Sequence, residues 1–202
     1  LKTTLELGGK AQFYTEVYDI PQLLSSITAA REQKISIKIL GTGSNVIISD
    51  EGVRGLVIGM RIKGVSYEHV SETELNLTVY AGEDWDTLVK SVATAGWAGL
   101  ECLSGIPGLV GASPIQNIGA YGQEAADTIS GVLVLEVATG VLQWLSAHDC
   151  QFGYRTSLFK KQPGRYIVIA IKFNLQKQNK INLKYHELSQ ALSLLPHPSV
   201  LQ

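Results

Sequence analysis

The chain has 202 residues, of which 45% are hydrophobic and 17% charged, so it can bury the core of one large domain or two small ones. Its formal net charge of −1 provides no overall field that would hold nucleic acid or an anionic membrane surface. The chain does not open on a basic region followed by an apolar one, so we expect a cytoplasmic protein with no nucleic-acid and no membrane partner.

The first half of the chain is predicted to alternate helices with short strands. Residues 19–34 share one apolar face, Asp19 is placed to cap a helix, and Pro21 suits the first turn. Three short apolar runs are predicted strands: 35–40, 55–60 and 75–82. A second helix, EDWDTLVKSVATAG, follows the last of them and ends at Gly96.

The second half is predicted to be mainly β-structure. Residues 131–146 fit two strands joined at Thr139-Gly140, and 165–176 fits a long buried strand. A final helix is predicted to begin with YHELSQAL. The whole pattern predicts an α+β fold in two units, a small α/β unit over 1–64 and a larger α+β unit over 65–202.

The cysteines and histidines do not form a metal-binding pattern. Cys102 and Cys150 lie far apart without CxxC or zinc spacing, so two buried thiols are the favoured interpretation. The four histidines show no ligand spacing either, and we predict no metal site.

A glycine-rich turn directly follows the first predicted strand. Its small and polar residues are Gly41, Gly43, Ser44 and Asn45. A turn of this kind can point several backbone N–H groups into one concavity, which suits a phosphate. The dinucleotide fingerprint GxGxxG is not met, because Val46 holds the third glycine position. Taken alone, an ordinary turn is the more probable interpretation.

A second segment, GIPGLVGASPIQNIGAYG at 105–122, has five glycines, two prolines and no charged side chain. Without a carboxylate, its backbone amides and small side chains can face an anionic or polar ligand. Ser113, Gln116 and Asn117 supply polar groups among isoleucines, a lining that suits a flat heteroaromatic ring attached to a diphosphate. The alternative is a crossover kept small for packing, but the two loops together favour ligand binding.

Four motifs occur in order along the chain: LGTGSNVIISDEGVRGLVI at 40–58, IPGLVGASPIQNIGAYG at 106–122, FGYRTSLFK at 152–160 and LKYHEL at 183–188. Together they resemble the UDP-N-acetylenolpyruvoylglucosamine reductase family. The resemblance implies FAD as cofactor, NADPH as reductant and UDP-N-acetylglucosamine enolpyruvate as small-molecule substrate, in peptidoglycan synthesis. It also implies two subdomains of the vanillyl-alcohol oxidase (PCMH) type with FAD between them.

The resemblance carries roles to matching positions. The residues implied to hold the FAD diphosphate region are Gly41, Gly43, Ser44 and Asn45. Those implied to line the flavin and its ribityl-diphosphate chain are Pro107, Ala112, Ser113, Pro114, Gln116, Asn117, Gly119 and Ala120. Arg155 matches the active-site arginine, while Tyr154 beside it and Tyr185 are expected to contact the substrate.

The residue type at position 155 suits the implied chemistry. A guanidinium can bind a carboxylate at two points and stabilise charge that grows as the enolpyruvyl group is reduced. Lysine cannot copy that planar fork. The alternative for a lone arginine is a structural ion pair.

Members of the resembled family continue for roughly another hundred residues, about one further domain. We therefore expect this chain to be a monomer that lacks the C-terminal substrate-binding domain and does not complete the reduction alone. Two alternatives stay open: another FAD oxidoreductase of the same superfamily, and a flavin-binding domain without catalysis.

Overall fold

The computed structural model describes residues 2–177, 187, 189 and 190. The strands are β1 (Ala11–Val17), β2 (Ile37–Leu40), β3 (Val53–Met60), β4 (Val65–His69), β5 (Glu74–Tyr80), β6 (Trp97–Ala98), β7 (Gly119–Ala120), β8 (Gln123–Glu124), β9 (Ile129–Glu136), β10 (Leu142–Ser146) and β11 (Tyr166–Lys177). The helices are α1 (Ile20–Glu32), α2 (Trp85–Thr94) and α3 (Leu158–Lys161). Short 3₁₀ turns occupy Glu101–Leu103, Val110–Ala112 and Ala125–Asp127.

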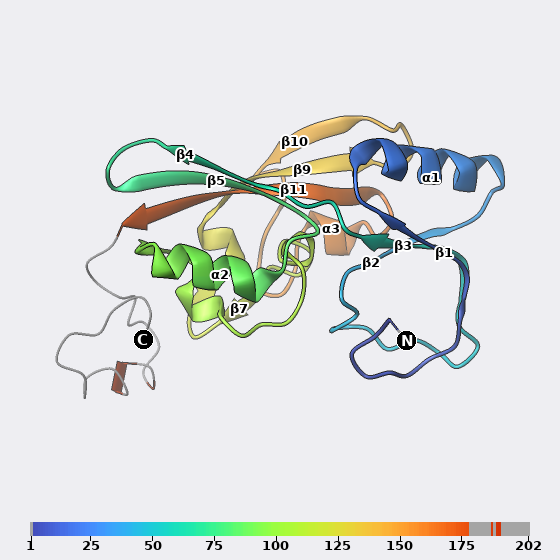
Figure 1. Ribbon diagram of the computed structural model, residues 1–202, viewed down its shortest axis with the longest axis horizontal. Coiled ribbons are helices and arrows are strands. Elements are labelled where there is room, and N and C mark those ends of the chain that lie inside the picture. Colours follow the sequence, from blue (N-terminus) through green and yellow to red (C-terminus); the bar gives the residue numbers. More distant parts are fainter. Residues whose placement is uncertain (1, 178–186, 188, 191–202) are drawn as a thin grey trace.

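The first sheet is small and parallel, with the order β1-β3-β2. Strands of a parallel sheet need crossover connections, and α1 lies in the one between β1 and β2, which flank β3 (Figure 1). The Asp19 carboxylate caps this helix by accepting a hydrogen bond from the Gln22 N–H at 2.7 Å. Leu23, Ile27 and Ala30 form its buried face, which confirms the helix predicted for this part of the chain.

The second sheet has the order β10-β9-β11-β5-β4, with β6 paired to the end of β11, and all these pairs are antiparallel. The predicted hairpin joins β9 to β10, and Gly140 in its turn has a φ of 74°. Helix α2 lies along one face of this sheet (Figure 1). The long buried strand predicted over 165–176 corresponds to β11, which pairs with β5 on one side and β9 on the other.

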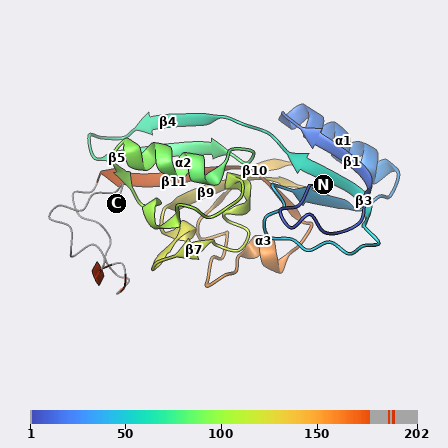
Figure 2. The ribbon, with the colours of Figure 1, turned by 60° about the horizontal axis from the view of Figure 1, so that its bottom comes forward.

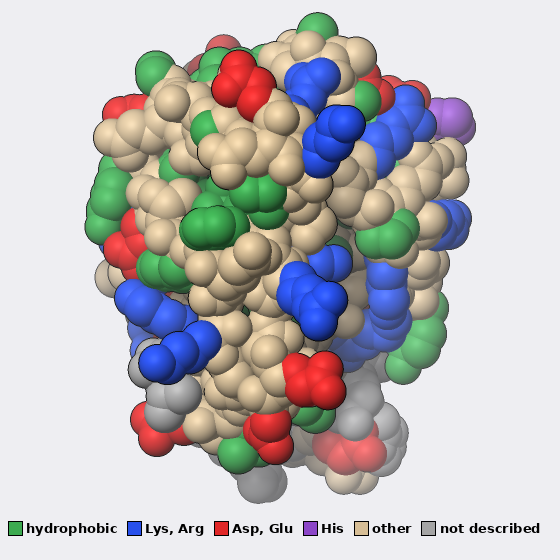
Figure 3. Space-filling view, turned by 90° about the vertical axis from the view of Figure 1, so that its right-hand side faces the viewer, with side chains coloured by type: hydrophobic (Ala, Val, Ile, Leu, Met, Phe, Trp, Pro, Cys, Tyr) green, Lys and Arg blue, Asp and Glu red, His purple; other side chains and the backbone are tan. Residues whose placement is uncertain are grey.

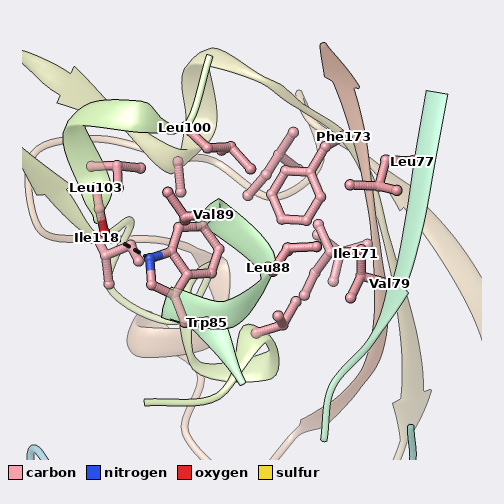
Figure 4. Packing of buried hydrophobic residues seen from close by; sticks show 14 of the residues in the cluster. Leu77, Val79, Trp85, Leu88, Val89, Leu100, Leu103, Ile118, Ile171 and Phe173 are labelled. Carbon is pink, nitrogen blue, oxygen red and sulfur yellow. Dashed lines mark hydrogen bonds between the residues drawn. The ribbon is translucent and has the colours of Figure 1, made fainter. Parts of the chain in front are cut away.

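A large apolar core fills the space between α2 and the second sheet. Its centre is Trp85, whose ring lies 6.1 Å from that of Phe173 on β11 (Figure 4). The indole N–H of Trp85 donates to the Leu103 carbonyl at 2.9 Å. Trp85 therefore joins the helix both to the sheet and to the segment that leads into the uncharged loop.

A second core cluster joins the two sheets. Ile27 of α1 and Ile58 of β3 share it with Leu135 of β9 and Ile169 of β11. The chain passes from the first sheet to the second between Met60 and Val65, and the two sheets pack against each other through this common core. The division of the chain into 1–64 and 65–202 stays a prediction.

The strands β1, β4, β6, β7 and β8 were not among the predicted elements. Both β1 and β4 lie at sheet edges, and all five residues of β4 are exposed. The sequence of β4, VSYEH, alternates apolar and polar residues, but over only five residues and with neither face buried, which gives a weak strand signal. The final helix, predicted to begin with YHELSQAL, falls largely outside the described residues. Within it the structure describes Glu187, Ser189 and Gln190, and all three are helical.

Charge is unevenly distributed over the surface. Figure 3 looks onto the end that carries α1 and the small sheet, where lysine and arginine side chains gather toward the right-hand side. Aspartate and glutamate side chains lie on the same face, so both signs of charge are present there. None of the helices in the described part of the chain combines the length and apolar character that a membrane crossing requires.

Asp86 ties α2 to the start of the uncharged loop. Its carboxylate pairs with Lys90 at 2.6 Å and accepts from the Gly105 N–H at 2.7 Å and the Ser104 hydroxyl at 3.0 Å. These contacts, the one with Lys90 first, lower the pKa of Asp86 from 3.8 to about 2. A carboxyl with a depressed pKa stabilises the fold above its unfolded-state pKa and stops doing so as pH falls through the folded-state value.

We therefore expect an Asp86→Asn variant to lose stability at pH 7 relative to the wild type, and to lose less of it as pH falls from about 4 to about 2. Urea unfolding at a series of pH values measures this. Asp50→Asn, at an exposed position, is the matched control. Parallel pH curves for the wild type and Asp86→Asn would show that Asp86 does not contribute to the acid sensitivity.

Candidate functional site

The glycine-rich turn after β2 and the uncharged loop meet at one cleft of about 480 Å³. The Ser44 hydroxyl donates to the Pro107 carbonyl at 3.1 Å and so joins segments that are 63 residues apart. The described residues that line the cleft are Ile39, Leu40, Gly41, Thr42, Gly43, Ser44, Asn45, Val46, Ile106, Pro107, Gly108, Leu109, Ala112, Ile115, Gln116, Ile118 and Lys160. The two loops therefore face one another rather than separate parts of the surface (Figure 2).

A smaller apolar chamber of about 220 Å³ continues from the cleft toward the two sheets. Both spaces are lined by Ile39, Gly41, Leu109, Ala112 and Ile115. The chamber is completed by Met60 of β3, Ala81, Gly111 and residues 166–168 of β11. The described lining of this chamber has no charged side chain, so it suits a flat apolar group attached to a polar one in the cleft.

The turn after β2 offers unused backbone donors. Within the described part of the chain, no acceptor is found for the N–H groups of Thr42, Gly43 and Ser44. Gly43 is buried, and a buried N–H without a partner is costly. Several such donors at the rim of one cleft form a place for an anion.

The positions held by glycine in the two loops differ in why a side chain is absent there. Gly43 has a φ of 75°, and a Cβ there would clash with the Lys2 carbonyl oxygen. A Cβ on Gly111 would lie 2.5 Å from that of Ala81. Gly41 has room for a Cβ, which would meet Leu109 at 3.6 Å. Packing thus accounts for Gly43 and Gly111, while Gly41 and Gly43 line the cleft and Gly111 lines the chamber, so the two interpretations of the loops are compatible.

Ser113 is 1% exposed, and its hydroxyl has no hydrogen-bond partner among the described residues. It lies between Ala112 and the buried Pro114, and it does not itself line the cleft. A buried hydroxyl without a partner is unusual in a folded protein, so Ser113 carries an unsatisfied polar group next to Ala112, which lines the cleft.

Asn117 is fully buried, and its side chain is engaged within the protein. Its amide nitrogen donates to Glu124 at 2.7 Å and to the Gly153 carbonyl at 3.2 Å, and its oxygen accepts from the Ala126 N–H at 2.9 Å. Asn117 therefore fixes the turn at Gly153 in position against the uncharged loop. Asn117 is not among the described residues that line the cleft or the chamber.

Arg155 stands on that same turn. Its guanidinium donates to the Gly119 carbonyl at 2.7 Å, and its φ of 53° lies in the left-handed region that few arginines adopt. Such conformations persist where surrounding contacts hold them, and they cluster at functional sites. In the described part of the chain Arg155 forms no ion pair with an acidic side chain, so the alternative of a structural ion pair finds no support there.

The remaining predicted site residues lie at the cleft, in the uncharged loop or beside Arg155. Pro107, Ala112 and Gln116 line the cleft, whereas Gly119 and Ala120 form β7. Tyr154 is 84% exposed, and its ring centroid lies 6.0 Å from the Arg155 guanidinium carbon. Tyr185 lies outside the described residues.

Lys160 was not among the predicted site residues, although it reaches the cleft. The motif FGYRTSLFK contains it, and that motif was the available signal.

Both cysteines are buried free thiols, as predicted. Burial raises the pKa of the Cys150 thiol to about 12 and also raises that of Cys102, so neither is poised as a nucleophile. Among the described residues, no group of three or more histidine, cysteine, aspartate or glutamate side chains could hold a metal ion.

Comparison with known proteins identifies the family. A family model described as an FAD binding domain matches residues 11–146. The UDP-N-acetylenolpyruvoylglucosamine reductase of Salinispora arenicola is 41% identical over 193 residues, which are 95% of this chain and 53% of that protein. The crystal structure of UDP-N-acetylenolpyruvylglucosamine reductase from Thermus caldophilus superposes with a TM-score of 0.72 at 30% identity, over 98% of this chain and 68% of that one. The chain belongs to this reductase family. Residues 11–146 are its FAD-binding domain.

The predicted α+β fold of the vanillyl-alcohol oxidase type is confirmed. A VAO-type flavoprotein from Myceliophthora thermophila C1 superposes with a TM-score of 0.59 at 16% identity, over 81% of this chain and 31% of that one. At that identity the likeness shows the fold alone. The chain spans about half the length of the curated relatives it matches.

The described cleft fits FAD, the cofactor of this family. Free N–H groups at Thr42 to Ser44 suit the diphosphate, and the adjoining apolar chamber suits a ring. The unpartnered Ser113 hydroxyl lies in the middle of the uncharged loop, next to Ala112, which lines the cleft. The described lining has no carboxylate to repel an anion.

Proposed function

We propose that this chain forms the FAD-binding portion of a UDP-N-acetylmuramate dehydrogenase, which reduces UDP-N-acetylglucosamine enolpyruvate with NADPH through FAD in peptidoglycan synthesis. The observation that carries the proposal is the junction of the two loops at one cleft, with the Arg155 turn fastened to the second loop. The family relationship supplies the substrate and the reductant.

In this proposal the turn after β2 binds the cofactor diphosphate. The N–H groups of Thr42, Gly43 and Ser44 would donate to its oxygens, with Asn45 at the rim and Gln116 on the facing loop. The small residues from Pro107 to Ala120 allow the backbone to approach the flavin and ribityl chain closely. When bound, FAD supplies hydride-transfer chemistry between NADPH and the enolpyruvyl double bond.

Arg155 and the two tyrosines act on the substrate side. The guanidinium already donates to the Gly119 carbonyl and retains further N–H groups for a substrate carboxylate. Because charge grows on that carboxylate side during reduction, a guanidinium held in place stabilises the transition state more than the ground state. Tyr154 and Tyr185 are proposed to contact the UDP-sugar, and Asn117 to hold the Arg155 turn.

The same proposal includes a monomeric protein in the cytoplasm, with a role in cell wall formation and hence in cell shape and division. Size-exclusion chromatography with light scattering measures the oligomeric state directly. A stable dimer at low protein concentration would contradict this part of the proposal.

The decisive experiment follows the visible absorption of the purified chain. We expect FAD to bind and give a flavin spectrum, and NADPH to bleach it faster than NADH. Anaerobic addition of UDP-N-acetylglucosamine enolpyruvate to the reduced protein is then expected to restore the oxidised spectrum where the substrate site is complete.

Each failure of this experiment has a different meaning. A chain that refuses added FAD contradicts the site itself. A bound flavin that NADPH does not bleach favours a flavin-binding domain without catalysis. Reoxidation by a different small molecule, but not by this substrate, favours another oxidoreductase of the same superfamily.

A further inference from the structure

The cleft between the two loops contains one cationic side chain that has no role in the proposed function. Among the described residues that line the cleft, Lys160 is the one charged side chain. The lining otherwise consists of apolar groups, glycines and uncharged polar residues. In the described part of the chain, Lys160 pairs with no acidic side chain. A cation left without a carboxylate in an otherwise uncharged cleft suits an anionic ligand.

Lys160 is held in place by its buried neighbours. It lies on α3, where Leu158 and Phe159 are buried in the core. The fully buried Ser157 caps this short helix and donates to the Ile115 carbonyl at 2.6 Å, which fastens α3 to the uncharged loop. The position of the Lys160 backbone relative to the cleft is therefore set by the same loop that lines the cleft.

The ammonium group of Lys160 donates to the main-chain carbonyl of Arg155 at 2.9 Å. An ammonium has three N–H donors, so this contact leaves two for another acceptor. Lys160 thereby connects the cleft to the turn on which Arg155 stands. Its neighbour Lys161 does not line the cleft and lies 3.5 Å from the Gln151 side-chain oxygen.

Resting on the proposed function, we propose that Lys160 is the cationic residue that binds the diphosphate of the FAD cofactor. Thr42, Gly43 and Ser44, with their unused N–H groups, and Lys160 line the same cleft. The diphosphate is the charged part of oxidised FAD, so it is the group that this cation neutralises. In doing so Lys160 also keeps its contact with the Arg155 carbonyl and steadies that turn.

The test is a comparison of FAD with riboflavin, which lacks the phosphates, by quenching of flavin fluorescence at low and high salt. We expect Lys160→Gln to weaken FAD binding about tenfold, because one charge-assisted hydrogen bond is lost, and to leave riboflavin binding unchanged. The salt dependence of FAD binding is expected to fall in the same variant, since one charge no longer meets the anion. Lys160→Glu is expected to weaken FAD binding further, and Lys160→Arg to retain most of it.

Lys161→Gln is the matched control, with the same charge change one residue away and outside the cleft. Equal FAD affinities for Lys160→Gln and Lys161→Gln would overturn the assignment. So would an equal loss of FAD and riboflavin binding in Lys160→Gln, since that would show a general change of shape. A wild-type chain that binds neither flavin contradicts the proposed function itself, which separates that failure from this one.

Discussion

Reduction of UDP-N-acetylglucosamine enolpyruvate is expected to slow by about 10²–10³ when Arg155 is replaced by lysine or alanine, the usual cost of removing one donor to a developing anion. Lysine keeps the charge but loses the planar fork and cannot keep both the Gly119 carbonyl and a two-point carboxylate contact. The rate to measure is anaerobic reoxidation of the pre-reduced flavin by the substrate, in a form of the protein in which the wild-type sequence shows it. Pre-reduction removes the NADPH step from the measurement.

Two controls separate catalysis by Arg155 from a structural role. Arg155 does not line the described cleft, so FAD affinity in Arg155→Lys is expected to stay close to that of the wild type. Arg165→Lys changes an arginine in a surface ion pair with Glu136 and is expected to leave the rate unchanged. A rate in Arg155→Lys within about twofold of the wild type would remove Arg155 from the catalytic role.

The position of Arg155 also explains which part of the site the sequence could predict. The resemblance of the motif implied that Arg155 is the active-site arginine. It could not reveal that Asn117 fixes the turn through the Gly153 carbonyl, because that contact joins residues 36 apart in sequence and depends on burial. Asn117 was predicted to line the cofactor, and the sequence could not reveal that its side chain hydrogen-bonds to Glu124, Gly153 and Ala126 within the protein.

The loops themselves were predictable because their chemistry is local. The glycines and the lack of charge in 105–122 indicate a backbone that lies close to another group, and in the structure this segment lines one cleft with Gly41 to Val46. The identity of that neighbouring group depends on residues far away in the sequence. Packing against Lys2 and Ala81 requires Gly43 and Gly111 before any ligand is considered. A lysine such as Lys160 looks like an ordinary surface residue until the fold places it in the cleft.

Helices and strands with one buried face could be predicted from the sequence, whereas fully exposed elements could not be predicted as well. Helix α2 shows its buried face in the spacing of Trp85, Leu88 and Val92, which all lie in the core. Edge strands such as β4 show no such face. The parts of the sequence that determine the site are therefore those that pack, and α2 bears on the site because Trp85 and Asp86 hold the entrance to the uncharged loop.

This dependence predicts a large loss of stability in Trp85→Ala. Trp85 is 1% exposed in the main core, and truncating such a side chain typically costs about 3–5 kcal/mol in the free energy of unfolding. Since a domain of this kind is stable by about 5–15 kcal/mol, the variant is expected to unfold at a much lower urea concentration and to bind FAD weakly. Trp85→Phe keeps most of the packing but leaves the Leu103 carbonyl without its donor, at a cost of about 1–3 kcal/mol.

Trp144→Ala is the matched control, because this tryptophan on β10 is 43% exposed and contacts the Lys172 ammonium at 4.4 Å from its ring centroid. Its removal is expected to cost within about 1 kcal/mol. Urea unfolding followed by circular dichroism measures all three variants, with and without FAD. Because FAD binds the folded state, it is expected to raise the midpoint of each variant that still forms the cleft. Equal midpoints for Trp85→Ala and Trp144→Ala would show that α2 does not hold the loop through its tryptophan.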